Sequence, residues 1–183
     1  MEKKQLGLSI IGCGMIARFH LLALREVAEF RVIGACDELA HLAEETAEQH
    51  GIKSYRSLRE ALADPEVDVV DICLPSGLHA EHGIEAARAG KHVIVEKPID
   101  VTLEAAQSLI GACRDAGVRL AVILQNRFSP SARRVKEAID AGALGRLYAG
   151  EAAVKWFRED KYYASSRWKG SKRFDGGGAL MNQ

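Results

Sequence analysis

A glycine-rich stretch near the start of the chain has the spacing needed to bind a phosphate-bearing cofactor. GCGMIA, residues 12–17, fits the pattern G-x-G-x-x-G/A, follows the short apolar run Leu6 to Ile11 and precedes a helical pattern. Glycines between a strand and a helix allow a tight turn, and the helix N-terminus offers free amides and a positive dipole to a pyrophosphate. The stretch predicts a dinucleotide-binding loop. Its expected cofactor contacts are Gly12, Gly14, Met15 and Ile16.

Asp37 stands where such a cofactor would place its adenosine ribose. It ends the next apolar run, FRVIGAC, 20 residues after Ala17, and a carboxylate at this place can accept hydrogen bonds from ribose hydroxyls. The alternative is that Asp37 only caps a helix starting at Glu38; the loop pattern, the spacing and the strand-helix context together favour the ribose. Glu38 follows directly and no Lys or Arg comes before Lys53. A 2′-phosphate would be repelled, which favours NAD and makes NADP the less expected cofactor.

The segment LPSGLH, from Leu74 to His79, is a second candidate for cofactor contact. It follows the apolar run VDVVDIC and would lie at the carboxyl edge of the sheet, where ligands bind in open α/β folds. Ser76 or His79 could touch the cofactor there, with Leu74 and Pro75 beside them. The sequence is equally compatible with the alternative that Pro75 and Ser76 only turn the chain and cap the next helix.

Glu96, Lys97 and Pro98 directly follow the apolar run VIV, and a charged pair at the end of a buried strand needs a reason. A lysine half buried at a sheet edge loses its proton more easily and can then act in proton transfer. A surface ion pair is the alternative, and the apolar run that leads straight into the pair argues against it. We therefore expect Lys97 to be catalytic.

These candidate residues would be brought together by a parallel sheet. Short Val/Ile/Leu-rich runs alternate with helical patterns, which is typical of a Rossmann-type, doubly wound α/β fold with helices on both faces. The expected strands are LGLSII, FRVIGAC, KSY, VDVVDIC, KHVIVE and VRLAVIL. In the last helix of the series, Leu103, Ala106, Ile110 and Cys113 mark one face, and Thr102 is the expected N-cap.

The pattern changes after residue 124. We assign residues 1–124 to a dinucleotide-binding domain and residues 125–183 to the beginning of a second, incomplete domain. Residues 131–141 have a helical pattern. RLYAGEAAVKWFR, residues 146–158, alternates in polarity and predicts a long strand, whose edges would need partner strands.

The composition excludes several kinds of partner. Lys plus Arg and Asp plus Glu are 25 each, so no net field draws the chain to nucleic acid or to an anionic membrane surface, and a small-molecule partner is expected. No apolar run approaches the ~20 residues that span a bilayer. We predict no metal site, because the histidines other than His79 lack ligand spacing and should be solvated or packed. They are His20, His41, His50, His82 and His92.

The cysteines indicate a reducing compartment. Cys13, Cys36, Cys73 and Cys113 form no C-x-x-C pair, and we expect buried, reduced thiols in a soluble cytoplasmic protein. The chain starts like a signal peptide, but two glycines break the apolar run, so a strand and a turn explain it better.

Several motifs together resemble the glucose-fructose oxidoreductase / inositol dehydrogenase (Gfo/Idh/MocA) family over the whole chain. They are IIGCGMIARFH, ACD, DPEVDVVDICLPSGLH, AGKHVIVEKP, QNRF, RWKG and DGGGALMNQ. The resemblance implies a Rossmann domain followed by a domain with a large, mostly antiparallel sheet, the active site lying between them. It implies that Lys97 contacts substrate and nicotinamide and assists proton transfer during hydride transfer, and that Glu96 lies beside the nicotinamide ribose. Full-length relatives are homo-oligomers.

The later motifs are most similar in form to UDP-N-acetylglucosamine-uronate 3-dehydrogenases, which implies a sugar, sugar-nucleotide or cyclitol substrate. The resemblance places Gln125 and Trp168 with the cofactor, and Lys97, Asn126, Arg127, Lys155 and Asn182 with the substrate. Cations and aromatic rings between residues 155 and 168 would suit a carboxylated or polyhydroxylated ligand. Residues 159–175 are equally compatible with a flexible basic loop.

The chain departs from many relatives at its end. The family often has D-x-G-x-H after the glycine run, whereas this chain has Asn182 in place of the Asp, and the sequence stops before the His. Asn182 can orient a hydroxyl but cannot take up a proton as a carboxylate does, so we count it as a catalytic contributor of this kind only. We expect these 183 residues to bind NAD with little or no turnover. The alternatives are a non-catalytic dinucleotide-binding or regulatory protein and a gene remnant.

Overall fold

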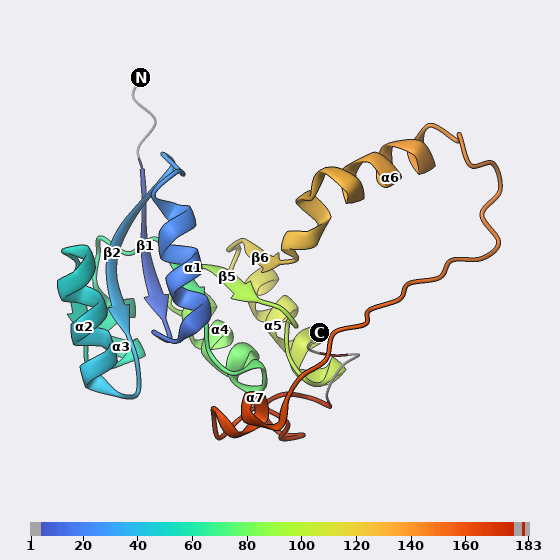
Figure 1. Ribbon diagram of the computed structural model, residues 1–183. Helices are drawn as coiled ribbons and strands as arrows, with labels where there is room; N and C mark the ends of the chain where they lie inside the picture. The colour runs from blue at the N-terminus through green and yellow to red at the C-terminus, as the bar shows by residue number, and fades with distance from the viewer. Residues whose placement is uncertain (1–4, 178–180, 182–183) are drawn as a thin grey trace.

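One sheet of six parallel strands organises the first two thirds of the chain (Figure 1). The computed structural model describes residues 5–177 and residue 181. The sheet order is β3-β2-β1-β4-β5-β6, which is the Rossmann-type arrangement expected from the sequence. The strands are β1 (Leu6–Ile11), β2 (Phe30–Cys36), β3 (Lys53–Tyr55), β4 (Val69–Ile72), β5 (His92–Glu96) and β6 (Leu120–Ile123).

Helices cover both faces of this sheet, as predicted. They are α1 (Met15–Leu24), α2 (Ala40–His50), α3 (Leu58–Ala63), α4 (His79–Arg88) and α5 (Leu103–Asp115), with a short 3-10 helix, η1 (Ser76–Leu78), before α4. Helices α1 and α2 pack with Leu8 and Ile10 on one face. Helices α3, α4 and α5 pack with Val70 and Ile72 on the other. The fold is therefore a three-layer sandwich with two apolar cores.

The strand register brings the ends of the central strands to one level. Ile11 of β1 pairs with Ile72 of β4, and Ile72 in turn pairs with Val95 of β5. Because the strands are parallel, the residues just beyond them meet at the same edge. The glycine loop, the LPSGLH turn and the Glu96-Lys97 pair therefore all leave the sheet side by side.

One predicted helix face is displaced by about one residue. In α5 the buried residues are Ala106, Leu109 and Cys113, whereas Leu103 and Ile110, which were expected on the inner face, are exposed. Helix α5 packs beside α4, and the Leu109 side chain lies so close to Gly83 of α4 that a Cβ there would be 2.6 Å from it. The position of α4 therefore determines which face of α5 is buried. The apolar periodicity of α5 alone does not give this information. The predicted N-cap is confirmed, since the Thr102 side chain accepts a hydrogen bond from the amide of Ala105.

The prediction about the cysteines is confirmed, since all four are free and buried. No helix within residues 5–177 combines the length and the apolar character that crossing a bilayer would require.

The second region begins with a helix that projects from the sheet. Residues Gln125–Phe128 form a 3-10 helix, η2, and Pro130–Asp140 form α6, close to the helix expected at 131–141. Ser129 caps α6 by accepting a hydrogen bond from the Ala132 amide, and Pro130 occupies the first turn, where its missing N–H costs nothing. None of the residues of α6 is buried, and Figure 1 shows the helix standing away from the other layers.

The strand predicted at residues 146–158 is wrong. This segment is extended but forms no β-ladder, and its side chains face water: Tyr148 is 96% and Phe157 is 84% exposed. A strand needs a neighbour for its backbone groups, and the described part of the chain offers none beside it. The alternating pattern therefore gives an extended conformation without a sheet.

The chain then returns to the Rossmann sheet through a closing segment, residues 170–177. The short helix α7 (Asp160–Ala164) precedes it, and both lie near α4 in Figure 1. The Gly77 amide donates a hydrogen bond of 3.0 Å to the carbonyl of Phe174. Asp175 is buried, and one of its carboxylate oxygens accepts the Gly170 amide at 2.7 Å. The closing segment thus seals against the LPSGLH turn by backbone contact.

We predict that Gly77→Ala detaches the closing segment. A Cβ at Gly77 would lie 2.0 Å from the carbonyl oxygen of Arg173, a backbone atom that cannot move aside without moving the segment. Trypsin should then cleave after Lys172 and Arg173 several times faster than in the wild-type chain, as followed by mass spectrometry.

Gly111→Ala is the matched control, because an added Cβ there meets no atom within 4 Å and the residue lies within α5. It should leave the cleavage rate unchanged. Equal rates for Gly77→Ala and Gly111→Ala would contradict the proposed seal.

Candidate active site

The glycine loop has the shape that a pyrophosphate site requires. Gly12 has a φ of +94°, and a Cβ there would lie 2.8 Å from the carbonyl oxygen of Cys73, so only glycine fits. Gly14 is the N-cap of α1, and no side chain caps the helix. A Cβ on Gly14 would meet nothing within 4 Å, so space is open above the first turn. The free amides and the open approach fit a bound phosphate group.

Asp37 is tied to the glycine loop. One carboxylate oxygen accepts a hydrogen bond of 2.7 Å from the Cys13 amide, and the other accepts one of 2.9 Å from the Leu39 amide. Helix α2 begins at Ala40 with Leu39 as its N-cap, so Asp37 is not the cap of that helix. The carboxylate is partly exposed beside the loop. It is therefore held where a ribose hydroxyl could donate to it.

The LPSGLH turn is locked to the Glu96-Lys97 segment by His79. The imidazole is buried, its Nδ1 lies 2.7 Å from the carbonyl oxygen of Pro98, and its Nε2 lies 2.8 Å from that of Leu74. Ser76 is also buried, whereas Leu74 and Pro75 are partly exposed. The His79 side chain thus joins two loops of the site from inside, and its predicted contact with the cofactor stays a prediction.

Glu96 and Lys97 differ in exposure. Glu96 is 5% exposed, and its Oε2 accepts a hydrogen bond of 2.9 Å from the amide of Lys97. Lys97 is partly exposed at the sheet edge, and its bond to Pro98 is cis. The predicted role of Lys97 in proton transfer stays a prediction.

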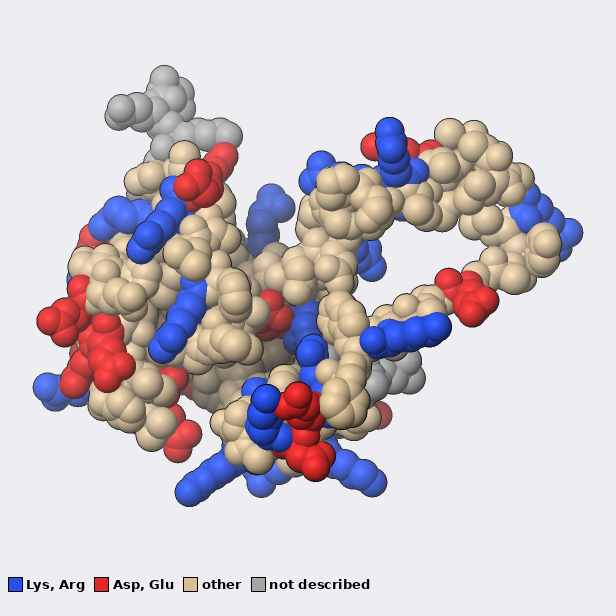
Figure 2. Space-filling view, in the orientation of Figure 1, with Lys and Arg blue, Asp and Glu red and all other residues tan. Residues whose placement is uncertain are grey.

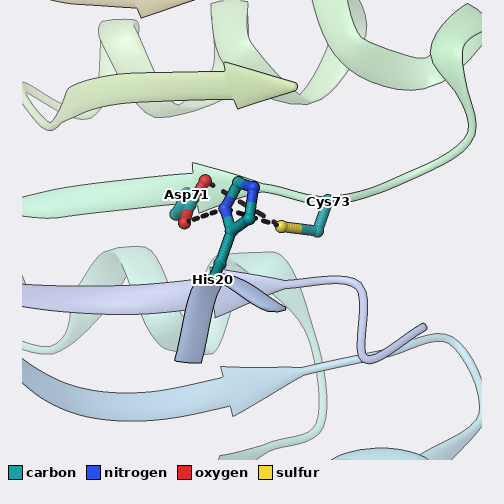
Figure 3. A group of neighbouring side chains, drawn as sticks. All are labelled: His20, Asp71 and Cys73. Atoms are coloured by element: carbon teal, nitrogen blue, oxygen red, sulfur yellow. Dashed lines mark hydrogen bonds and ion pairs between the residues drawn. The ribbon is translucent and has the colours of Figure 1, made fainter. Parts of the chain in front are cut away.

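A network around His20 was missed by sequence reasoning (Figure 3). His20 lies on α1, where its Nδ1 is 2.8 Å from Oδ2 of Asp71 and its Nε2 is 3.1 Å from Oε1 of Glu96. The Sγ of Cys73 is 3.5 Å from the same Nδ1. The usable clue was Asp71, an acid inside the apolar run VDVVDIC, because a buried carboxylate needs a partner.

The network keeps His20 charged. Burial alone would lower the pKa of the imidazole, but hydrogen bonds with Asp71, Cys73 and Glu96 outweigh it and raise that pKa to about 12. Burial likewise raises the pKa of the Cys73 thiol to about 12, so this cysteine stays protonated. The cluster contains two carboxylates and one imidazolium.

The same residues could be considered as metal ligands, since atoms of His20, Asp71 and Cys73 lie within 4.8 Å of one another. Two ligand atoms around a tetrahedral zinc ion stand about 3.3 Å apart, given bond lengths near 2.0–2.1 Å. The Asp71 oxygen and the His20 nitrogen are closer, at 2.8 Å, which is the length of a charge-assisted hydrogen bond. Hydrogen bonds account for this cluster.

The residues predicted in the second region are more dispersed. Gln125, Asn126 and Arg127 are exposed on η2, and Lys155 is exposed on the extended segment. Trp168 is partly buried before the closing segment. Among the described residues, none of these five forms a hydrogen bond or an ion pair with Glu96. Asn182 lies outside the described residues.

An aromatic and cationic group lies next to the closing segment. The Arg158 guanidinium lies over the Trp156 ring at 5.5 Å and over the Tyr162 ring at 5.0 Å, and Lys169 lies over Tyr162 at 4.3 Å. Figure 2 shows further Lys and Arg side chains around α7 and the residues after it. Acidic side chains lie among them in Figure 2, and Glu159 forms an ion pair with Lys161.

The strand order and the glycine loop are those of a dinucleotide-binding Rossmann domain. Residues 6–124 match the family model described as "Oxidoreductase family, NAD-binding Rossmann fold", and residues 132–183 match that of the GFO/IDH/MocA C-terminal domain. The chain belongs to the Gfo/Idh/MocA family of oxidoreductases.

Known relatives bind nicotinamide cofactors and sugar compounds. The WlbA dehydrogenase from Bordetella pertussis, solved in complex with NADH and UDP-GlcNAcA, is 35% identical, with a TM-score of 0.94 over 100% of this chain and 55% of its own. Levoglucosan dehydrogenase from Pseudarthrobacter phenanthrenivorans is 32% identical over 97% of this chain and 48% of its own length. KijD10, a 3-ketoreductase from Actinomadura kijaniata solved with NADP and TDP-benzene, is 30% identical, with a TM-score of 0.71 over 76% of this chain and 43% of its own. The chain thus spans about half the length of these relatives.

The charged His20 predicts how stability depends on pH. The pKa of His20 is near 6.5 in the unfolded chain and raised to about 12 in the folded one, so the stabilisation is complete below pH 6.5 and is lost as pH rises toward 12. The unfolding free energy from urea denaturation should therefore fall between pH 7 and 9, by up to about 1.4 kcal/mol per pH unit from this group. In His20→Asn this contribution should vanish. Parallel pH curves for the two proteins would contradict the assignment.

Proposed function

We propose that this chain binds NAD(H) across the carboxyl edge of its sheet and belongs to an enzyme that oxidises or reduces a sugar, sugar-nucleotide or cyclitol. The pyrophosphate would lie over the glycine loop, the adenosine ribose at Asp37, and the nicotinamide ribose at Glu96. One observation carries the proposal: an uncapped helix N-terminus, a carboxylate at the end of β2 and a carboxylate-lysine pair at the end of β5 share one sheet edge.

Lys97 is the proposed proton-transfer group. Oxidation of a secondary hydroxyl to a ketone removes a hydride from carbon and a proton from oxygen. Bound NAD would supply the hydride acceptor, and Lys97 in its neutral form would take the hydroxyl proton; in the reverse direction its ammonium would return it. The Glu96 carboxylate accepts a hydrogen bond from the Lys97 backbone amide, which restricts the positions that the Lys97 side chain can reach. Asn182 is proposed to orient a substrate hydroxyl.

The cofactor is proposed to be NAD rather than NADP. Asp37 and Glu38 would stand beside the 2′ position, and further acidic side chains gather over α2, as Figure 2 shows on that side of the molecule. Bringing a phosphate dianion to this place would meet like charge. Relatives use either cofactor, so the preference is a property to be measured for this chain.

The substrate is proposed to carry an acidic group or many hydroxyls. The cation-π group of Arg158, Tyr162 and Lys169, with exposed Arg127 and Lys155, offers positive charge and ring faces for a sugar acid or a nucleotide phosphate. The likeness to WlbA, which was solved with UDP-GlcNAcA, supports this class. Asn126 is proposed to add an amide contact from η2.

Gly12→Ala tests the cofactor site. The substitution forces a side chain into a left-handed conformation 2.8 Å from a carbonyl oxygen and fills the loop, so NADH affinity should fall at least about tenfold. The measurement is fluorescence titration with NADH, with NADPH in parallel. The wild-type chain should bind NADH more tightly than NADPH.

Gly90→Ala is the matched control. Gly90 also has a positive φ, +76°, but a Cβ there meets nothing within 4 Å, and the residue lies at the end of α4 away from the loop. It should share the backbone strain and keep NADH affinity. Loss of affinity in both variants, or in neither, would argue against binding at this loop.

Lys97→Met separates catalysis from binding. The wild-type chain is expected to turn over slowly at best, so NADH formation from NAD and UDP-N-acetylglucosaminuronic acid is followed at high chain concentration. In Lys97→Met it should fall by a further factor of about 10²–10⁴, as expected for loss of a general acid-base group, while NADH binding stays within about threefold. Stopped-flow absorbance at the NADH band measures the first, and fluorescence titration the second. If the wild-type chain binds NADH but shows no substrate-dependent signal that Lys97→Met removes, the non-catalytic binding function is favoured.

A further inference from the structure

We infer that His20 is a positioning residue for the cofactor site: it holds the Glu96 carboxylate in place from inside the fold. The inference rests on the proposed function, because the ligand to which Glu96 would present itself is the nicotinamide ribose. His20 contacts Glu96 through its Nε2, 3.1 Å from Oε1, and on this inference it acts on the ligand through that carboxylate.

The ring of His20 joins three elements of the site. It is carried by α1, the helix whose uncapped N-terminus faces the pyrophosphate position. Its two nitrogens contact carboxylates on two neighbouring strands, Asp71 on β4 and Glu96 at the end of β5. A single imidazole therefore ties the phosphate-binding helix to the strand that carries Lys97.

Both contacts need the doubly protonated ring. Neutral imidazole has one N–H, whereas two carboxylates on opposite nitrogens each need a donor. Asp71 and Glu96 are 2% and 5% exposed, so each would be a costly buried charge without a partner. The Cys73 thiol, whose Sγ lies 3.5 Å from Nδ1, also faces the ring and is uncharged, so the imidazolium supplies the positive charge between the two carboxylates.

The result is a Glu96 carboxylate with a fixed orientation. One oxygen, Oε1, is held by His20, and the other, Oε2, by the Lys97 amide. Two donors from different directions define the plane of the group, and each oxygen keeps acceptor capacity for a ribose hydroxyl. Without His20 the carboxylate would lose the donor to Oε1, and the Lys97 amide alone would not fix its plane.

A purely structural role for His20 makes a different prediction. If the imidazolium served only to neutralise Asp71 and to fix α1, its loss would disturb the whole helix and weaken every ligand that uses the glycine loop. If it acts through Glu96, only ligands that reach the nicotinamide ribose should be affected. NADH and ADP distinguish these cases, since ADP has the adenosine ribose and the two phosphates but lacks the nicotinamide half.

The test uses two substitutions that each keep one of the two contacts. The amide nitrogen of Asn reaches the place of Nδ1, so His20→Asn keeps the donor to Asp71 and loses the one to Glu96. The amide nitrogen of Gln reaches the place of Nε2, so His20→Gln does the reverse. By isothermal titration calorimetry, His20→Asn should weaken NADH about tenfold and ADP by less than twofold, and His20→Gln should bind NADH within about threefold of the wild-type chain.

Glu96→Gln completes the cycle. On the inference, Glu96→Gln alone weakens NADH by a similar factor, and adding His20→Asn to it causes little further loss, because both act through one carboxylate. This cycle also decides the matter if His20→Asn does not fold, since Glu96→Gln can be combined with His20→Gln instead; loss of NADH binding beyond that of Glu96→Gln would then overturn the inference.

The outcomes separate the inference from the proposed function. If the wild-type chain binds neither NADH nor ADP, the cofactor site and the inference both fail. If it binds both, and His20→Asn weakens NADH and ADP equally or leaves both unchanged, the role of His20 as a positioning residue is overturned while the cofactor site stands. Full additivity of His20→Asn and Glu96→Gln would overturn it as well.

Discussion

The site depends on the parallel register of β1, β4 and β5. Ile11, Ile72 and Val95 stand in register, so the chain leaves all three strands at one level and delivers three loops to one place. Side chains alternate along each strand, and Asp71 pairs in register with Ile94, which shares a face with Glu96. Both carboxylates therefore point to the side covered by α1. A slip of one residue would send them into the other core.

Because of this alternation, two buried carboxylates face α1, and a histidine of α1 supplies the positive charge that pairs with them. Two acids on the inner face of an otherwise apolar sheet would destabilise the fold if left unpaired. His20 approaches between them, so α1 docks through an imidazolium as well as through Ala17 and Leu21. The helix whose N-terminus is proposed to bind the cofactor is thus joined to β4 and β5 by the same imidazole that contacts Glu96. Packing and charge place the two halves of the site together.

Much of this could be predicted from the sequence where the determinants are local. The glycine loop, Asp37 and the Glu96-Lys97 pair depend on a strand, a turn and the start of a helix, all within a few residues, and the structure brings them to one sheet edge as the pattern indicates. The alternation predicted a parallel, doubly wound sheet, and the glycine loop with Asp37 indicated its Rossmann type. The partial burial of Lys97 was also predicted, because a charged pair follows directly on a buried run.

The rest depended on neighbours distant in sequence. His20 shows no ligand spacing, and its partners lie 51 and 76 residues away, so only the docking of α1 on the sheet reveals it. The inner face of α5 follows Gly83 of α4, and residues 146–158 have the alternation of a strand but no strand to pair with. Hydrophobic periodicity indicates which residues of an element are buried, but it does not show against which other element they pack.

The contact between the Rossmann sheet and the closing segment also depends on residues distant in sequence, and it is made by backbone atoms. Gly77 needs its lack of a side chain because the closing segment passes over it, with the Arg173 carbonyl oxygen only 2.0 Å from the position of a Cβ. The amide of Gly77 donates a hydrogen bond to the carbonyl of Phe174. The buried Asp175 carboxylate accepts one from the Gly170 amide within the same segment. A turn that begins at the sheet edge next to Cys73 therefore supports residues from the far end of the chain. The cofactor edge and the proposed substrate side are linked through this turn, which His79 in turn fastens to the segment carrying Lys97.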